Sequence, residues 1–229
     1  MLKCKLQNEK CKMKILFIPC RSNKDIMPAV KKAAKKIEAQ QIGIITTSQH
    51  LHQLEEAKSF LEEKGKTVVF SGQAIGCEKI SSGADAFLYI GSGRFHPLNI
   101  AIRSGKPVIL ANPYSSEADE ISRQEITLLE KRKKSRLMRA AAAQTFGILV
   151  STKPGQENMA LASELREKIN ANGKSAFLLA GNEINPRNLL GFEMDTFVNT
   201  ACPRIVEDEF EKPVINPDEL GIILGTPDD

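Results

Sequence analysis

The fold is decided by two related stretches, IGIITTSQHLHQLEEAKSFLEEKGKTVVF at residues 42–70 and FGILVSTKPGQENMALASELREKINANGKSAFLL at residues 146–179. Each starts with a short apolar run typical of a buried strand, continues with a helical pattern, and passes a Gly-Lys turn into a second apolar run. Each is followed by a loop and a strand that starts with aspartate, at residues 85–90 and 195–199. The copies are too far apart for a solenoid repeat, so the pattern indicates a duplicated domain.

This alternation of strands and helices predicts an α/β fold with two homologous units, each built on a parallel sheet of about four strands flanked by helices. The predicted organisation is an N-terminal tail at 1–13, a first α/β unit at 14–117, a connecting helix at 118–145 and a second α/β unit at 146–229. Within it, further elements are predicted as a strand at 14–19, a helix at 25–40, a helix at 49–64 with Ser48 as its N-cap, and a long helix over 118–144.

The composition is that of an ordinary globular protein, with 41% hydrophobic and 26% charged residues in a chain of 229. The net charge of +4 is modest, and the basic run at 131–136 is typical of a solvated helix face, so nucleic acid is not an expected partner. No apolar stretch approaches the roughly 20 residues that cross a membrane, and the N-terminal stretch has no signal-peptide core. We therefore expect a cytoplasmic protein.

Polar residues follow the strand at 85–90. Gly91, Ser92 and Gly93 precede a helical pattern that starts near Pro97. Glycines let a backbone approach a ligand, and a helix N-terminus offers N–H groups to an anion. Arg94 and His96 add a guanidinium that can hold a carboxylate and an imidazole. The same pattern is also typical of a simple tight turn, because a lone Gly-x-Gly motif is weak evidence.

Two of the five cysteines lie in loops. Cys77 belongs to the glycine-rich stretch GQAIGCE, and Cys202 follows a strand in VNTACPRI. Thiolates favour zinc or iron–sulfur centres, although this wide separation matches no zinc finger and buried, inert thiols are the alternative. Because ligands of open parallel sheets bind beyond the carboxyl ends of the strands, both thiols and the 91–96 turn are expected to face one cleft.

The other candidates are weaker. Cys4 and Cys11 lie in a Lys-rich stretch, and Cys20 ends a predicted strand with no motif around it. His50 and His52 do not share a helical face, so joint metal binding is not expected and both are predicted to be surface residues.

With these residues in view, the chain resembles the family of 2-(3-amino-3-carboxypropyl)histidine synthases, which carry out the first step of diphthamide synthesis. The resemblance runs from about residue 14 to residue 225. It rests on the stretch at 42–66, GQAIGCE, YIGSGRFHPL, KPVILANPYS, the helical stretch at 125–156, VNTACPRI and KPVINPDELGIILG. Among these motifs, GSGRFHP and NTACPR are the most specific.

The resemblance implies three similar domains in a full-length chain, each with one cysteine, that together hold a [4Fe–4S] cluster. The cluster binds S-adenosylmethionine, and a 3-amino-3-carboxypropyl group passes to a histidine of translation elongation factor 2. Carried over, Cys77 and Cys202 match the second and third cluster cysteines. The S-adenosylmethionine pocket is matched by Gly91, Ser92, Gly93, Arg94 and His96.

The family's first domain and its cysteine have no counterpart here, so a partner chain is expected to supply the third thiolate in a homo- or hetero-oligomer. Residues Cys77, Cys202 and the 91–96 turn are all kept, which favours an enzyme subunit. The alternatives are a catalytically incomplete accessory or binding protein, which keeps the fold and the pocket without a full cluster, and a truncated gene product.

Overall fold

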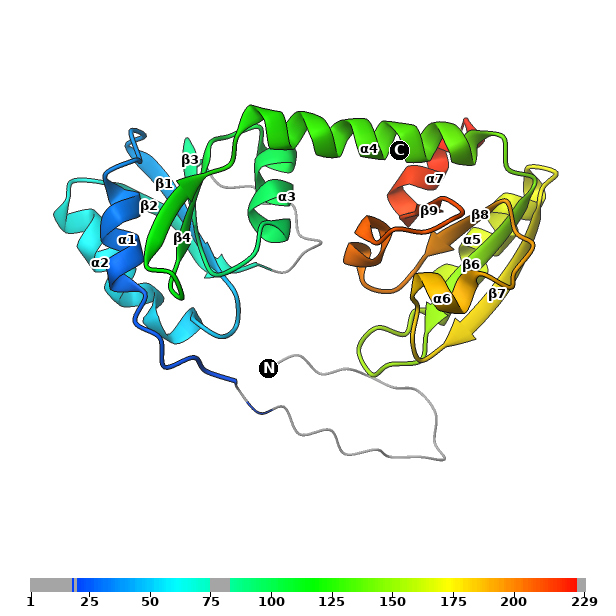
Figure 1. Ribbon diagram of the computed structural model, residues 1–229, viewed down its shortest axis with the longest axis horizontal. Helices are drawn as coiled ribbons and strands as arrows, with labels where there is room; N and C mark the ends of the chain where they lie inside the picture. Colours follow the sequence, from blue (N-terminus) through cyan, green and yellow to red (C-terminus); the bar gives the residue numbers. More distant parts are fainter. Residues whose placement is uncertain (1–17, 19, 75–82, 226–229) are drawn as a thin grey trace. The chain divides into compact units, whose positions relative to one another are not determined.

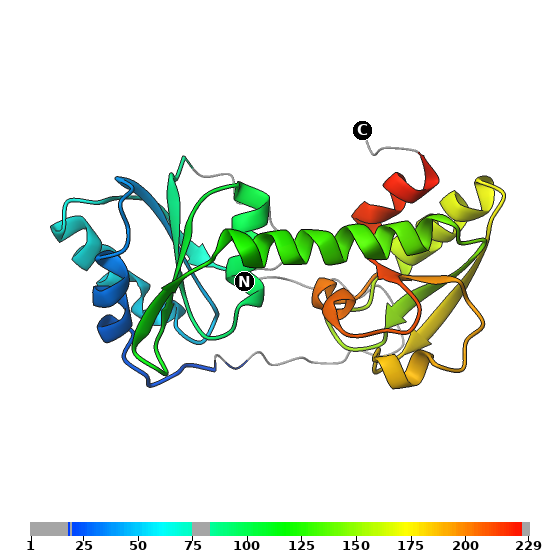
Figure 2. The same ribbon diagram turned by 45° about the horizontal axis from the view of Figure 1, so that its top comes forward.

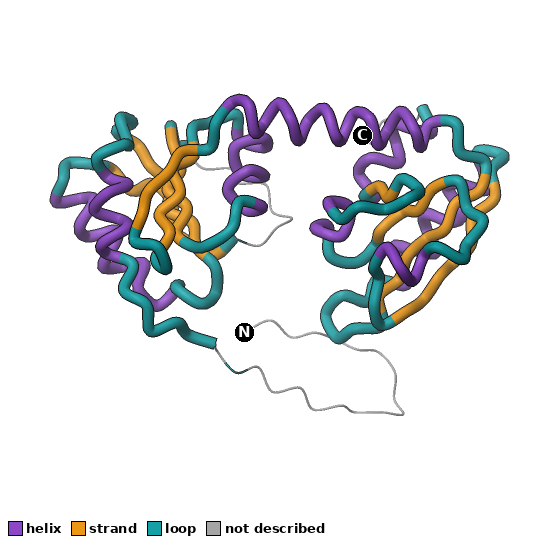
Figure 3. Tube along the Cα trace, in the orientation of Figure 1, coloured by secondary structure: helices purple, strands orange, loops and turns teal. Residues whose placement is uncertain are grey.

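Two β-sheets organise the structure, a computed structural model that describes residues 18, 20–74 and 83–225 (Figure 1). The chain divides into one unit within residues 8–128 and a second that contains residues 129–229, and each unit has its own sheet. In both units, strands run side by side with helices around them (Figure 3). The α/β class expected from the alternating pattern is confirmed.

The unit within residues 8–128 is built on a five-stranded sheet. Its strands are β1 (Gln41–Thr46), β2 (Thr67–Gln73), β3 (Ala86–Ile90), β4 (Val108–Asn112) and β5 (Glu117–Glu120). They pair in the order β2-β1-β3-β4-β5, where the first four are parallel and β5 runs antiparallel to β4. The carboxyl ends of β1, β3 and β4 therefore lie along one edge, which is where such sheets bind ligands.

Helices cover both faces of this sheet (Figures 1 and 2). On one face, α1 (Met27–Ala34) and α2 (Leu54–Glu63) pack on the inward side chains Ile42, Ile44 and Leu88; η1 (Leu51–Gln53) leads into α2. On the other face, α3 (Phe95–Ser104) packs on Ile45 and Tyr89. Neighbouring positions of one strand thus serve two cores, because successive side chains of a strand point to opposite faces.

The second unit repeats this plan with four parallel strands. They are β6 (Thr145–Ser151), β7 (Ser175–Gly181), β8 (Thr196–Asn199) and β9 (Val214–Ile215), in the order β7-β6-β8-β9. One face carries α5 (Met159–Ala171), α7 (Pro217–Leu224) and the end of α4 (Arg123–Ala141). The short helices α6 (Pro186–Leu189) and η2 (Pro203–Glu207) cover the other face.

The two units agree in strand order and in a packing detail. The order β2-β1-β3-β4 corresponds to β7-β6-β8-β9. In β1, a Cβ atom on Gly43 would lie 2.6 Å from the ring of Phe87, its partner on β3; in β6, a Cβ atom on Gly147 would lie 2.5 Å from the ring of Phe197, its partner on β8. The same glycine–phenylalanine pair recurs, which is what an internal duplication predicts.

Three predicted elements differ from the structure. Helix α1 is shorter than the predicted 25–40. Ser48 does not cap α2, which begins after η1 at Leu54; the Gln53 side chain instead accepts a hydrogen bond from the N–H of Ile26 at 3.2 Å. Residues 117–120 extend the sheet as β5, so α4 begins at Arg123 rather than near 118. The predicted strand at 14–19 lies outside the described residues except for Ile18, which belongs to no strand.

Helix α4 ends at Ala141, and the backbone N–H groups that follow it donate hydrogen bonds outside the helix. The Asp195 carboxylate accepts hydrogen bonds from the N–H groups of Gln144 (2.9 Å) and Thr145 (2.8 Å) and from the Thr145 hydroxyl (2.8 Å). These bonds lower the pKa of Asp195 and join the start of β6 to the start of β8.

Among the residues described, every helix is too short or too polar to span a bilayer.

Candidate functional site

The 91–96 turn connects the carboxyl end of β3 to α3. The N–H of Gly91 donates to the carbonyl of Ala111 at the end of β4, at 3.0 Å, which fixes the turn at the sheet edge. Gly93 has φ of +80°, a left-handed conformation that only glycine adopts without strain. The helix starts at Phe95, earlier than the sequence predicted, so the glycines stand directly before its first turn.

The N-terminus of α3 leaves hydrogen-bond donors unused. Arg94, its N-cap residue, makes no side-chain cap, and the first turn contains no acidic residue. No hydrogen bond within the described part of the chain is donated by the backbone N–H groups of Gly93, Arg94 or Phe95. Free N–H groups at the positive end of a helix attract anions.

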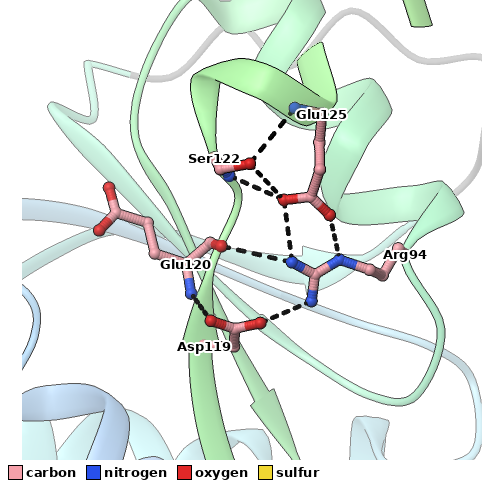
Figure 4. Close-up of polar contacts among 5 residues, drawn as sticks. All are labelled: Arg94, Asp119, Glu120, Ser122 and Glu125. Carbon is pink, nitrogen blue, oxygen red and sulfur yellow. Dashed lines mark hydrogen bonds and ion pairs between the residues drawn. The ribbon is translucent and has the colours of Figure 1, made fainter. Parts of the chain in front are cut away.

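The Arg94 side chain is engaged by acidic residues from elements further along the chain (Figure 4). Its Nη1 donates to Asp119 Oδ2 at 2.8 Å and its Nη2 to Glu125 Oε2 at 3.0 Å, while Nε donates to Glu125 Oε1. Nη2 also reaches the carbonyl of Glu120 at 3.4 Å. The guanidinium thus ties the turn after β3 to β5 and to the start of α4, and its expected role in ligand binding stays a prediction.

A capping box at the start of α4 holds the second carboxylate of this cluster. The backbone N–H and hydroxyl of Ser122 donate to Glu125 Oε2 at 2.9 Å and 2.8 Å, and the N–H of Glu125 donates to the Ser122 hydroxyl at 3.2 Å (Figure 4). The hydrogen bond from Arg94, followed by those from Ser122, lowers the pKa of Glu125 to about 2. Arg94 also lowers the pKa of Asp119.

The Arg94–Glu125 pair predicts a pH dependence of stability. Because the folded pKa of Glu125 lies below its unfolded value of about 4.3, its contribution is full above the unfolded pKa and is lost as the pH falls toward 2. The Arg94 side chain is 38% exposed, so water screens the pair and we expect a loss of only about 1 kcal/mol between pH 6 and pH 3. Urea unfolding at both pH values measures it.

Glu125→Gln should lose less stability over this pH range than the wild-type chain, because glutamine does not titrate. Glu130→Gln on the same helix is the matched control, since Glu130 has no ion pair among the described residues. Equal pH slopes for all three proteins would contradict the prediction.

Tyr89, in β3, lies beside this turn, and no pattern in the sequence predicted a polar role for it. Its side chain is 0% exposed, its ring stacks on His96 with centroids 6.0 Å apart, and within the described part of the chain its hydroxyl has no hydrogen-bond partner. Burial raises its pKa to about 12, so the hydroxyl keeps its proton at neutral pH. A tyrosine inside the apolar strand AFLYI is expected to be an ordinary core residue. Only the unpaired hydroxyl, which the structure shows, sets Tyr89 apart from its neighbours in the core.

His50 corrects another expectation. It is 0% exposed rather than a surface residue, while His52 is exposed as predicted. The His50 ring lies edge-on to Tyr114 at 5.9 Å, and neither ring nitrogen has a hydrogen-bond partner among the residues described. Burial, and then the charge of His52, lower the pKa of His50. The prediction failed because His50 lies in a turn before η1, where its N–H donates to the carbonyl of Thr47, and not on an exposed helix face.

In the second unit, Cys202 lies at the carboxyl edge of the sheet, as the motif predicted. It precedes η2 directly after β8, is partly exposed, and forms no disulfide. Its side chain lines a pocket of about 300 Å³ together with Ser151 at the end of β6 and Asn182 after β7. Two positively charged residues, Lys153 and Arg204, and one negatively charged residue, Asp208, also line the pocket. The excess of positive charge favours anionic ligands.

The Cys202 turn is held by a chain of buried and half-buried polar side chains. Asn199 Nδ2 donates to the carbonyl of Cys202 at 2.9 Å and to Asn216 Oδ1 at 3.1 Å. The N–H of Asn216 donates to Glu219 Oε2 at 2.9 Å, and Glu219 pairs with Arg136 of α4 at 3.0 Å. Such a fixed backbone holds a thiol in one place, which a metal ligand requires.

The remaining predicted ligands are not assembled in the described residues. Cys77 lies outside them, as do Cys4 and Cys11, and Cys20 is exposed in the other unit. In residues 18, 20–74 and 83–225, no three histidine, cysteine or acidic side chains come together in a way that would hold a metal ion.

Comparisons with known proteins agree with these features. A family model for diphthamide synthesis proteins matches residues 3–229. A 2-(3-amino-3-carboxypropyl)histidine synthase from Pyrococcus horikoshii is 32% identical over 92% of the chain and 65% of its own length. One from Methanocaldococcus jannaschii is 29% identical over 96% of the chain and 65% of its own length. The chain thus spans slightly less than two thirds of these relatives.

Solved structures show the same fold. Dph2 from Pyrococcus horikoshii, in a crystal structure with a 4Fe-4S cluster, matches with a TM-score of 0.81 and 32% identity, over 90% of the chain and 64% of its own. A second crystal structure of that protein matches with a TM-score of 0.82 and 31% identity, over 91% of the chain and 65% of its own.

Proposed function

The chain belongs to the diphthamide synthesis protein family, and from this premise we propose that it forms part of a 2-(3-amino-3-carboxypropyl)histidine synthase. In this proposal, residues 14–117 and 146–229 correspond to the family's second and third domains, joined by the helix within 118–145. The protein acts in the cytoplasm on translation elongation factor 2. The observation that carries the proposal is Cys202, a partly exposed free cysteine that lines a pocket at a sheet edge together with Lys153 and Arg204.

Cys202 fits a metal ligand on its own geometry. Its thiol is free, it opens into a pocket of about 300 Å³, and Asn199 holds its backbone carbonyl. Cys77 is the second proposed ligand of the same [4Fe–4S] cluster. In this proposal the third thiolate comes from a partner chain that carries the family's first domain, because recruiting Cys4 or Cys11 would mean ordering a Lys-rich stretch with little apolar burial to offset the cost. When bound, the cluster supplies the electron that starts cleavage of S-adenosylmethionine.

The other proposed residues bind the co-substrate. The turn formed by Gly91, Ser92 and Gly93 lines the S-adenosylmethionine pocket and offers the backbone N–H of Gly93, and Arg94 and His96 complete this side of the pocket. In the overall reaction, the Cγ–S bond of S-adenosylmethionine breaks and a bond forms between Cγ and C2 of the histidine imidazole. Methylthioadenosine and the C2 proton leave, so atoms and electrons balance.

A transfer assay tests this function. The chain is reconstituted anaerobically with iron and sulfide in the presence of a polypeptide that carries the family's first domain, and then incubated with elongation factor 2 and S-adenosylmethionine labelled in its aminocarboxypropyl carbons. Label should enter the elongation factor in equal amount to the methylthioadenosine released. Binding of S-adenosylmethionine without release of methylthioadenosine would instead identify an accessory or binding protein.

A further inference from the structure

Tyr89 carries an unexplained polar group. Its hydroxyl is fully buried and has no hydrogen-bond partner among the described residues, whereas buried polar groups in native proteins nearly always have one. Leaving such a group unpaired costs stability, so an orphan hydroxyl calls for a reason such as a bound ligand. A phenylalanine would fill the same space in the core around Phe87 and Ile100 without that cost.

The hydroxyl lies against the turn before α3. A Cβ atom on Gly91 would stand 2.9 Å from the Tyr89 oxygen, so the hydroxyl lies directly against the backbone of the turn and only a glycine leaves room for it there. The residues next in the chain, Ser92 and Gly93, are exposed. Because Gly91 and Gly93 have no side chain, this turn can adjust its backbone angles at little steric cost when a ligand enters.

Several hydrogen-bond donors converge at this turn. The backbone N–H groups of Gly93, Arg94 and Phe95 are unused within the described residues, and α3 has no acidic residue in its first turn. The protonated phenol of Tyr89, which lies against Gly91, adds a further donor. Several donors at one place suit an anion, and the positive end of a ten-residue helix favours one.

Building on the proposed function, we infer that Tyr89 and the N-terminus of α3 bind the carboxylate of S-adenosylmethionine, with the Tyr89 hydroxyl as a direct donor. This carboxylate is the only anionic group of the co-substrate. Arg94, whose guanidinium already pairs with Asp119 and Glu125, then acts by holding the turn in place rather than by binding the carboxylate itself.

Tyr89→Phe tests the inference, with Tyr114→Phe as the matched control because Tyr114 is the other tyrosine of the chain and is 49% exposed. Equilibrium dialysis with the chain reconstituted together with the first-domain polypeptide measures the affinity for S-adenosylmethionine and for its decarboxylated form. Tyr89→Phe should weaken binding of S-adenosylmethionine about tenfold, as expected for a lost hydrogen bond to a charged group. It should leave binding of the decarboxylated form unchanged.

Thermal unfolding of the ligand-free variants gives a second readout. Tyr89→Phe should melt at the wild-type temperature or above it, because no partner loses a bond. A lower melting temperature would show that the hydroxyl serves the fold and would overturn the inference. So would equal binding of S-adenosylmethionine by Tyr89→Phe and wild type, or an equal loss for both ligands. If the wild-type chain binds neither compound, the proposed function itself fails.

Discussion

In the chain reconstituted with a first-domain polypeptide, Cys202→Ser should lower the rate of aminocarboxypropyl transfer by at least about 100-fold and should also reduce the iron retained after anaerobic reconstitution. At metal sites, replacing a residue that only orients a ligand lowers metal affinity or activity about 10–100-fold. Replacing the ligand itself should have at least as large an effect. Serine keeps the size of the side chain, and Cys202 is only partly exposed at the rim of its pocket, so the fold should persist. Iron and sulfide analysis and the transfer assay measure the two effects.

Two matched variants sharpen this result. Cys20→Ser removes an exposed cysteine of the other unit and should match the wild-type chain in iron content and transfer. Asn199→Ala frees the carbonyl of Cys202 and the N–H of Ala201, so it should reduce cluster retention less than Cys202→Ser does. Wild-type iron content in Cys202→Ser, with an unchanged circular dichroism melting curve, would remove Cys202 from the ligand set.

The 229-residue chain alone should retain a cluster poorly, and co-expression with a polypeptide carrying the family's first domain should restore both the cluster and transfer to elongation factor 2. Three protein thiolates leave one iron open for S-adenosylmethionine, and Cys77 and Cys202 supply two. Recruiting Cys4 or Cys11 would order a Lys-rich stretch at a cost of about 1–2 kcal/mol of backbone entropy per residue, with few apolar side chains to offset it. A folded cysteine loop avoids most of that cost.

Iron content per chain and the yield of labelled elongation factor, with and without the second polypeptide, measure this effect. A first-domain polypeptide whose cysteine is replaced by alanine is the control, and it should restore neither quantity. A fully loaded and active cluster in the 229-residue chain alone would show that the third ligand is internal. Cys4→Ala, Cys11→Ala and Cys20→Ala would then identify it.

Local sequence patterns predicted where several of the candidate residues lie in the fold. The apolar run before Asn199 and the proline after Cys202 place that cysteine at the carboxyl end of a strand, and the glycines of the 91–96 turn place the start of α3. These features depend on neighbouring residues, so periodicity and turn chemistry predict them. The error at α4 arose because the capping box of Ser122 and Glu125 lies within a longer helical pattern.

The sequence by itself determined the duplicated α/β plan, because alternating apolar runs, helical periodicity and the repeated aspartate-initiated strand are local signals. Only the tertiary structure decided that Arg94 pairs with Asp119 and Glu125, and that His50 and Tyr89 are buried without partners. Those features join residues far apart in the chain. Hydrogen bonds and ion pairs between such residues form only when the helices and strands pack together. Residue spacing and composition therefore do not predict them.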